Sequence, residues 1–421
     1  MSLEQIIDTV TNSPPPHNFT LVLAIMVLAG SGSIMSTDLY APSLPYLTEY
    51  FGTTPELMKL TISLNLIVYG FAQLIYGPLS DRFGRRPVFL GSIILFTISS
   101  LACAFAQSID QLLIARVLQG FFAAAEAVMC LAVFKDLFTE QEQVKGFAIY
   151  GMSIALAPAV APVLGGYIHV LFGWQYNFYV IAAVGVLTSF LIFLLLPEST
   201  TPDPHALKIK SILRNYLTVI RNPVFMVYGV LAGLALGLIY AFVTGAPFIL
   251  ISYFGVEIQH FGYFQAAIVV PFFLGSMLAT RLVDFWPSVR VFNHGLAVLI
   301  FGAVMVVGFV FIGGLSPYTL TFAYLFIAFG LGPVFAVATS KAMAAVEHSA
   351  GSAAAMFGSL EIGLSGVIAA MVSVFHDNTP APFGIIIGLT GLAALVLGVI
   401  ANRMNSAVAD TSPLADSHAR Q

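Results

Sequence analysis

The chain contains 421 residues, of which 59% are hydrophobic and 9% are charged, and its formal net charge at pH 7 is -4. A soluble protein carries about 25% charged residues, so this composition excludes a water-soluble globular domain and predicts an integral membrane protein. The basic residues are scattered over short loops rather than gathered on one face, so no nucleic-acid-binding surface is expected. Cys103 and Cys130 both lie in apolar runs, which argues against a disulfide framework.

Apolar runs of about 20 residues, the length that an α-helix needs to cross a bilayer, recur along the whole chain. We expect an all-α integral membrane protein whose first six spans lie near 19–41, 57–77, 87–106, 109–134, 144–170 and 174–196. The second six lie near 223–250, 260–280, 291–313, 317–341, 349–375 and 382–402. The predicted domains are an N-terminal tail (1–18), a six-helix bundle (19–196), a linker (197–222), a second six-helix bundle (223–402) and a C-terminal tail (403–421). Two halves of nearly equal length favour related bundles with a substrate site between them.

The basic residues predict the orientation of these spans. Of the 16 Lys and Arg residues, 14 fall on one side of a twelve-span arrangement, leaving Lys59 near the other face and Arg116 within a span. Because basic loop residues stay in the cytoplasm, we expect both termini to be cytoplasmic. The segment before the first span contains Glu4 and Asp8 but no Lys or Arg, so we expect this span to be retained rather than cleaved as a signal peptide.

The linker and the two tails have a different composition from the spans. Apolar residues recur at helical spacing in the linker, which predicts that part of it lies flat on the membrane surface: Ile209, Ile212, Leu213, Tyr216, Leu217 and Ile220. The tails, Met1–Asn18 and Asn405–Gln421, are predicted to be disordered.

The segment Gly77–Pro87, with the sequence GPLSDRFGRRP, places four charges and two glycines between two apolar runs. Charges are costly in hydrocarbon, and glycine lets a chain reverse sharply. We therefore expect a tight cytoplasmic loop between the second and third spans.

Three motifs resemble those of the major facilitator superfamily. The loop is similar to its signature G-x-L-a-D-r-x-G-r-r, and Arg116–Gly120 (RVLQG) is similar to R-x-x-q-G. Ala157–Gly166 (APAVAPVLGG) resembles the antiporter motif G-P-x-x-G-G, with Ala161 where the motif usually has Gly. In addition, Ser36–Pro45 and Gln73–Pro78 resemble the Bcr/CflA group of drug:proton antiporters.

Some segments depart from the shared signatures. Arg281–Pro287, the second-half counterpart of the loop, keeps its charges but lacks the glycine pattern. Glu126, Lys341 and Glu361 belong to no shared signature, so they are the positions where the specificity of this chain is expected.

The resemblance implies the major facilitator fold and a bacterial cytoplasmic (inner) membrane location. It also implies a cytoplasmic gate, in which Asp81 caps a second-half helix and Arg85 pairs with Asp136, so that the cytoplasmic side is shut in the outward-open state. The gate residues are Gly77, Asp81, Arg82, Gly84, Arg85 and Asp136. Small and helix-bending residues of the antiporter motif suit a tight contact between the halves: Pro158, Pro162, Gly165 and Gly166.

Four charged residues within the spans are candidates for proton and substrate coupling: Asp38, Arg116, Glu126 and Glu361. A charge at mid-bilayer costs roughly 2.5–3.5 kcal/mol, so such residues indicate a partner, a water-filled cavity or a function. Asp38 and Arg116 are predicted at similar depth, where Asp38 binds a proton or a cationic group and Arg116 tunes its pKa. The alternatives are an interfacial Asp38 and permanently protonated, hydrogen-bonded glutamates. Lys341 is predicted to extend towards the headgroups.

Aromatic residues in several spans are candidates for the wall of a substrate cavity: Tyr40, Tyr69, Phe122, Tyr150, Tyr240 and Phe248. The histidines do not cluster in the sequence, and we expect no metal site. The sequence also lacks the phosphate loop G-x-x-x-x-G-K-[ST]. We therefore expect no cofactor, with a proton gradient as the energy source.

These observations favour a secondary active transporter, not an enzyme. The resemblance implies a proton-coupled antiporter that exports small amphipathic or cationic compounds by alternating access. Its expected partners are a small-molecule substrate, protons and membrane lipid, without nucleic acid, and the protein is expected to be a monomer.

Three alternatives remain open. An exporter or importer of one metabolite, such as a siderophore, amino acid or peptide, would use the same fold. A polytopic membrane enzyme would need clustered catalytic groups, and the sequence has neither H-E-x-x-H nor G-x-S-x-G. A sensor or scaffold with a transporter fold would tolerate loss of the intramembrane carboxylates, which are present here.

Overall fold

The computed structural model describes residues 18–346, 350–375 and 379–410. Within these residues twelve helices are long and apolar enough to cross a membrane, which confirms the predicted all-α membrane architecture. The predicted disordered tails lie largely outside the described residues. The last helix, however, continues to Asp410, so the prediction of disorder was wrong for residues 405–410.

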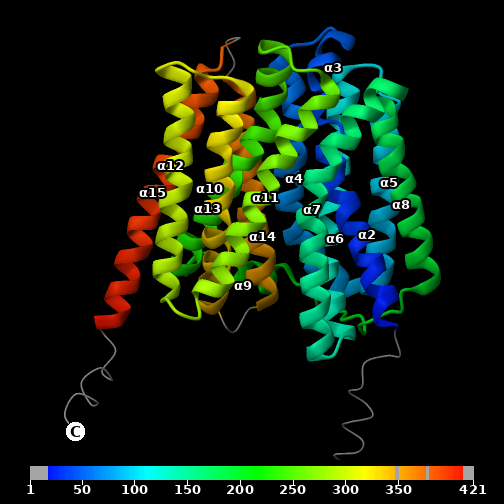
Figure 1. Ribbon diagram of the computed structural model, residues 1–421. Coiled ribbons are helices and arrows are strands. Elements are labelled where there is room, and N and C mark those ends of the chain that lie inside the picture. The colour runs from blue at the N-terminus through cyan, green and yellow to red at the C-terminus, as the bar shows by residue number, and fades with distance from the viewer. Residues whose placement is uncertain (1–17, 347–349, 376–378, 411–421) are drawn as a thin grey trace, which may run out of the picture.

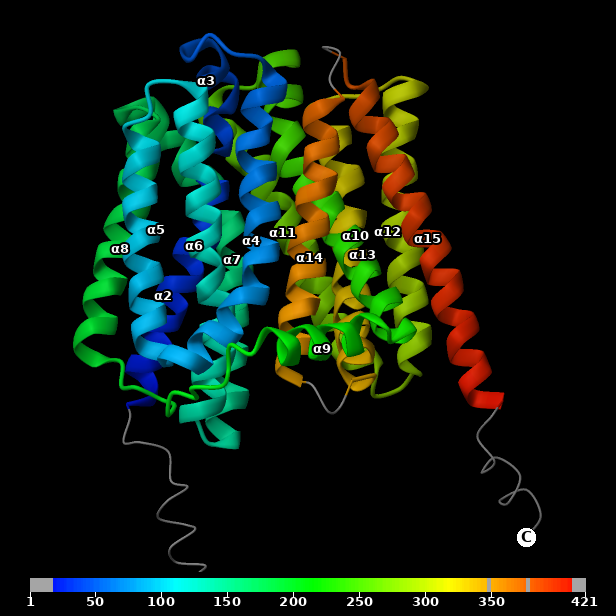
Figure 2. The ribbon, with the colours of Figure 1, turned by 180° about the vertical axis from the view of Figure 1, so that it is seen from behind.

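The helices form two bundles that lie side by side (Figures 1 and 2). The first bundle consists of α2 (Phe19–Asp38), η1 (Ala41–Ser43), α3 (Leu44–Tyr50), α4 (Pro55–Phe83), α5 (Arg85–Ala104), α6 (Ile109–Leu137), α7 (Glu140–Phe172) and α8 (Gln175–Leu195). The linker contains α9 (Ile209–Ile220). The second bundle consists of α10 (Pro223–Pro247), η2 (Phe248–Tyr253), α11 (Ile258–Leu282), α12 (Ser288–Phe311), α13 (Pro317–Ala344), α14 (Ala350–Val374) and α15 (Ala381–Asp410).

The two ends of the molecule differ in charge. We call the end that carries Arg82, Arg85, Arg86 and the linker helix α9 the basic end, at the bottom of Figure 1. The end that carries α3, at the top of Figure 1, is called the opposite end. The first transmembrane segment reaches the opposite end in pieces, because α2 stops at Asp38 and η1 and α3 follow it.

The turn between α4 and α5 is shorter than predicted. A single residue, Gly84, separates the two helices, and its φ of 97° lies in a region that favours glycine. The prediction of a loop over Gly77–Pro87 was wrong, because α4 continues past Pro78 to Phe83. Asp81 and Arg82 therefore lie on the last turn of α4, where the helix leaves the apolar layer.

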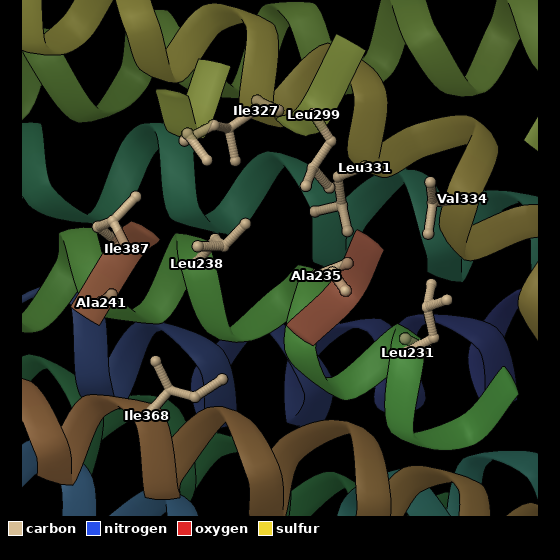
Figure 3. Close-up of a cluster of buried hydrophobic side chains, with 14 of the residues drawn as sticks. Leu231, Ala235, Leu238, Ala241, Leu299, Ile327, Leu331, Val334, Ile368 and Ile387 are labelled. Atoms are coloured by element: carbon tan, nitrogen blue, oxygen red, sulfur yellow. The ribbon is translucent and has the colours of Figure 1, made fainter. Parts of the chain in front are cut away.

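Interdigitated aliphatic side chains hold the second bundle together (Figure 3). Leu231 and Leu238 of α10 lie between Leu331 of α13 and Ile368 of α14, and these four side chains are 4% exposed or less. Lipid tails are as apolar as leucine, so burial against lipid gains nothing, and association depends on close packing. Ala235 and Ala241 allow that packing, since their small side chains leave room for the neighbouring helices.

Close backbone approaches join the halves along two helix pairs, α4 with α14 and α7 with α11. A Cβ atom added to Gly70 of α4 would lie 2.5 Å from the backbone nitrogen of Gly363 in α14. In the second pair, a Cβ at Gly262 of α11 would lie 2.4 Å from the Cα of Val163 in α7. Small residues are what permit such approaches between membrane helices.

The contacts between the halves are found in the middle and at the opposite end. The hydroxyls of Ser63 and Ser373 are 2.8 Å apart, and those of Tyr167 and Tyr263 are 2.7 Å apart. In contrast, a methyl group at Gly77, towards the basic end of α4, would meet no described atom within 4 Å. The structure is therefore closed between the halves at the opposite end.

The linker helix α9 supports the prediction of a surface helix. Ile209, Leu213 and Leu217 form an exposed apolar stripe at helical spacing, whereas Val219 is fully buried against the second bundle. The hydroxyl of Tyr216 donates a hydrogen bond of 2.8 Å to the carbonyl of Leu74 in α4. The linker helix therefore touches both halves.

Candidate functional site

Arg116 of α6 lies fully buried beside the end of α2. Its guanidinium donates to the carbonyl of Ser36 (3.0 Å), the carbonyl of Thr61 (3.3 Å) and the hydroxyl of Thr37 (3.4 Å), and it also bonds the side-chain oxygen of Gln119. The ring of Tyr40 lies 4.7 Å from the guanidinium carbon. Because the C-terminus of a helix carries a partial negative charge, the arginine stabilises the point at which α2 breaks.

Asp38 is the last residue of α2 and is 2% exposed. Its Oδ1 accepts a hydrogen bond of 3.2 Å from Nε2 of Gln265, on α11 of the other half. An acid at a helix C-terminus is unfavourable for the helix dipole, so Asp38 requires compensation from its neighbours. The contact with Gln265 was not anticipated from the sequence, because a single glutamine in an apolar run carries no motif.

The predicted interaction of Asp38 with Arg116 is electrostatic rather than a contact ion pair. The guanidinium binds Ser36 and Thr37, the two residues before Asp38, and within the described residues its hydrogen bonds go to backbone and neutral groups. Arg116 is therefore a structural cation that places positive potential near Asp38, and the prediction of similar depth is confirmed.

Glu126 lies ten residues, almost three turns, further along α6 and is 1% exposed. The hydroxyl of Tyr150 on α7 donates a hydrogen bond to its Oε1. Gly30 of α2 packs over this pair, because a Cβ at Gly30 would lie 2.8 Å from Oε1 of Glu126. Three helices of the first half therefore fix one carboxylate.

Glu361 of α14 presents a second carboxylate from the other half. Its side chain is half-buried, and its backbone carbonyl accepts a 2.6 Å hydrogen bond from Ser365. Tyr69 of α4 lies within electrostatic range of both Glu126 and Glu361, and Tyr240 of α10 lies within range of Asp38 and Glu361. We call Tyr69, Glu126, Tyr150, Tyr240 and Glu361 the central cluster.

The six aromatic residues predicted to line a cavity divide into two groups. Tyr69, Tyr150 and Tyr240 belong to the central cluster and are half-buried. Tyr40 is 1% exposed beneath Arg116, and its role as a wall residue stays a prediction. Phe248 lines a small pocket at the opposite end, where its ring packs 4.8 Å from the ammonium group of Lys59. Phe122 packs in a small apolar cluster with Ala161.

At the basic end, the predicted pairing of Arg85 with Asp136 is present, with Nε and Oδ2 3.1 Å apart. Asp81 also binds Arg85, at 2.5 Å. All three residues belong to the first half, so the interactions do not join the two halves in this conformation. Among the described residues Asp81 makes no hydrogen bond or ion pair with a second-half helix, so its predicted capping role stays a prediction.

Glu198 of the linker is a contributor at this turn that the sequence did not reveal. Its carboxylate accepts hydrogen bonds from the backbone nitrogens of Arg85 (2.9 Å) and Arg86 (3.2 Å). These are the first nitrogens of α5, which have no partner within the helix. Gly84 also makes room for the carboxylate, because a Cβ there would lie 2.6 Å from Oε2 of Glu198.

The antiporter motif lies at the packed region of the opposite end. A Cβ at Gly165 would lie 1.7 Å from the carbonyl oxygen of Leu39, and one at Gly166 would lie 2.7 Å from that of Ile258. Pro158 and Pro162 both lie inside α7. The expected tight contact between the halves is therefore made by Gly166, whereas Gly165 packs against α2 of its own half.

Comparison with known proteins places this geometry in a family. Residues 26–370 match the family model of the Major Facilitator Superfamily. The "Bicyclomycin resistance protein homolog" of Haemophilus influenzae is 29% identical over 394 residues, covering 91% of this chain and 94% of the relative. The "Multidrug resistance protein D" of Escherichia coli is 27% identical over 402 residues, covering 92% of this chain and 98% of the relative.

A solved structure shares the fold. A bacterial homologue of the human lysosomal transporter Spinster, in an inward-facing and occupied conformation, aligns with a TM-score of 0.66 at 14% identity. The alignment covers 93% of this chain and 97% of that one. This similarity shows the arrangement of the helices.

Proposed function

Because the chain belongs to the Major Facilitator Superfamily, we propose that this transporter is a proton-coupled antiporter that exports small amphipathic or cationic compounds. The observation that carries the proposal is the placement of carboxylates from both halves near the centre. Glu126 comes from the first half and Glu361 from the second, and the three tyrosines of the central cluster lie among them. Aromatic faces and carboxylates together suit an amphipathic cation.

The arginine that lies beside the end of α2, next to Asp38, supports the same substrate class. Arg116 is fully buried, and its hydrogen bonds go to backbone and neutral side chains around α2 and α4. It is therefore committed to the protein itself and does not offer a binding site for an anion. The names of the relatives in H. influenzae and E. coli, which refer to resistance, agree with an export function.

Exchange follows from competition for a negative charge. An ionised carboxylate binds either a proton or a substrate cation, and each ligand excludes the other. Asp38 is the proposed exchange site, since it lies at the contact between the halves, and Glu126 and Glu361 are proposed to attract and hold the substrate. Such a carrier uses the proton gradient and needs no cofactor.

The topology completes the proposal. The basic end faces the cytoplasm of a bacterial inner membrane, in accordance with the positive-inside rule, so that the described conformation is inward-facing. Opening of the opposite end would bring the basic ends of the bundles together, where Gly77 and Asp81 would meet α14. We propose that this contact is the gate, and that a monomer suffices for transport.

Proteoliposomes with an internal pH dye test this function. Under an imposed proton gradient, tetraphenylphosphonium should trigger proton flux in the wild type, and Asp38→Asn should abolish it. Glu126→Gln and Glu361→Gln should raise the KM for the cation, while Glu49→Gln, at an exposed site of the opposite end, should behave as wild type. Flux triggered by an amino acid or peptide alone would show a metabolite carrier instead, and absence of flux with all compounds would refute antiport.

A further inference from the structure

Three helices close the opposite end with almost no free space between them. The glycines at this place, Gly165 and Gly262, let the backbones of α2 and α11 approach α7. Asp38 and Gln265 lie in the same region. Asp38 is next to Leu39, which packs against Gly165, and Gln265 follows Gly262 by three residues on one face of α11. We call this region the seam, formed by Asp38, Leu39, Val163, Gly165, Gly262 and Gln265.

The hydrogen bond from Gln265 to Asp38 is a polar contact across the seam. Both side chains are buried, with Gln265 4% exposed. The other atom of the amide, Oε1 of Gln265, makes no hydrogen bond within the described part of the chain. A buried acceptor without a donor is costly. Oε1 of Gln265 is such an acceptor, and it lies beside the carboxylate of Asp38, which can take up a proton.

Within the described part of the chain, few other charged or titratable groups face Asp38. Arg116 of α6 and Tyr240 of α10 lie within electrostatic range, and the ring of Tyr40 packs against the guanidinium. On α11 no charged side chain occurs between His260 and Arg281. Across the seam, the charge of Asp38 is therefore stabilised by the hydrogen bond from the amide of Gln265.

We propose that Gln265 makes closure of the seam depend on the charge of Asp38. A hydrogen bond to an ionised carboxylate is about twice as strong as one between neutral groups. When a proton neutralises Asp38, its hydroxyl becomes a donor, and rotation of the amide presents Oε1 as the acceptor. The contact persists in this state, but as a weaker, neutral bond.

As a consequence, the transporter does not open at the opposite end while it carries neither a proton nor a substrate. The empty, ionised transporter is held closed at the opposite end, and neutralisation of Asp38 by a proton or a substrate cation releases it. Gln265 acts as a positioning residue through Asp38. The inference rests on the proposed proton coupling, and it specifies how the charge of Asp38 reaches the other half.

Distance measurements on the full chain in lipid nanodiscs test this inference without substrate. Nitroxides on Tyr46→Cys and Tyr253→Cys, both exposed at the opposite end and on different halves, report closure by pulsed electron paramagnetic resonance. In the wild type, the ratio of closed to open forms should rise as the pH is raised and Asp38 ionises. Gln265→Leu should lower this ratio about tenfold at alkaline pH and leave it little changed at acidic pH.

Gln265→Glu provides the sharper variant, because it keeps the size of the side chain. Two ionised carboxylates repel each other, so the opposite end should open at alkaline pH and close at acidic pH, which reverses the wild-type dependence. Gln259→Leu, the same exchange nearer the start of α11, should keep the wild-type profile. The inference is wrong if Gln265→Leu weakens closure equally at every pH, or if Gln265→Glu retains the wild-type profile. Transport assays can fail while this reversal persists, so the two proposals fail separately.

Discussion

The hydroxyl of Tyr150 is hydrogen-bonded to the carboxylate of Glu126, and Gly30 of α2 packs directly against both groups. The missing Cβ of this glycine leaves the space that the pair occupies. A Cβ there would lie 2.8 Å from Oε1 of Glu126 and 2.9 Å from a ring carbon of Tyr150. The position of the buried carboxylate therefore depends on a residue that carries no charge.

Gly30→Ala should displace this pair and impair transport. Overpacking of a buried site costs typically 1–3 kcal/mol, and we expect destabilisation of about this size together with a clear fall in substrate-driven proton flux. Thermal unfolding and the proteoliposome assay measure the two effects. Gly151→Ala on α7 is the matched control, because a Cβ there meets no described atom within 4 Å. Equal behaviour of the two variants would contradict the proposed packing.

Arg116→Lys should inactivate the protein although it keeps the positive charge. The arginine donates in several directions at once, to the carbonyls of Ser36 and Thr61 and to the side chains of Thr37 and Gln119. A lysine has three donors on one atom and cannot reproduce this planar geometry. Each buried acceptor left without a donor costs about 1–3 kcal/mol, so the melting temperature should fall strongly. A variant with wild-type stability would show that charge alone suffices.

The sequence predicted features that repeat or that belong to a motif. Apolar length gave the twelve spans, and the signature loop predicted the pairing of Arg85 with Asp136. The central carboxylates were found because a charge within an apolar run is conspicuous. Glycine in the antiporter motif also indicated close packing before any contact was known.

Contacts between distant segments could not be predicted in this way. Gln265 is a neutral residue in an apolar helix, and nothing in the chain order indicates that it meets Asp38. In the sequence Glu198 is one of several charged residues of the linker, and nothing there indicates that its carboxylate binds the start of α5. Tyr40 lies in a buried stack with Arg116, which the sequence could not distinguish from a place in an open wall.

Gly166→Ala should favour conformations that are open at the opposite end. The added methyl group would lie 2.7 Å from the carbonyl oxygen of Ile258 on the other half, so the halves would have to separate there. Labelling of a cysteine placed near this contact should therefore become faster than in the parent protein. Gly308→Ala is a suitable control, since that position has open space among the described residues. Unchanged labelling would show that the contact yields without opening.

A proline explains why the linker helix binds α4, and this can be tested by a double-mutant cycle. The carbonyl of Leu74 would normally accept a hydrogen bond from the backbone nitrogen four residues later, but that residue is Pro78, which has no N–H. The hydroxyl of Tyr216 supplies the missing donor at 2.8 Å. Tyr216→Phe should therefore lower the free energy of unfolding by about 1 kcal/mol.

The same substitution should cost almost nothing in a Pro78→Ala background, because the alanine restores the helical donor to Leu74. Two independent, additive effects would contradict this account.

The pH dependence gives a further check. Burial, together with the charge of Asp81, raises the pKa of Tyr216 from 10.0 to about 12. The folded protein thus holds the phenolic proton more tightly than the unfolded chain. The contribution of Tyr216 to the free energy of unfolding should be constant below pH 10 and should be lost as the pH rises from 10 to about 12. Tyr216→Phe should remove this alkaline step.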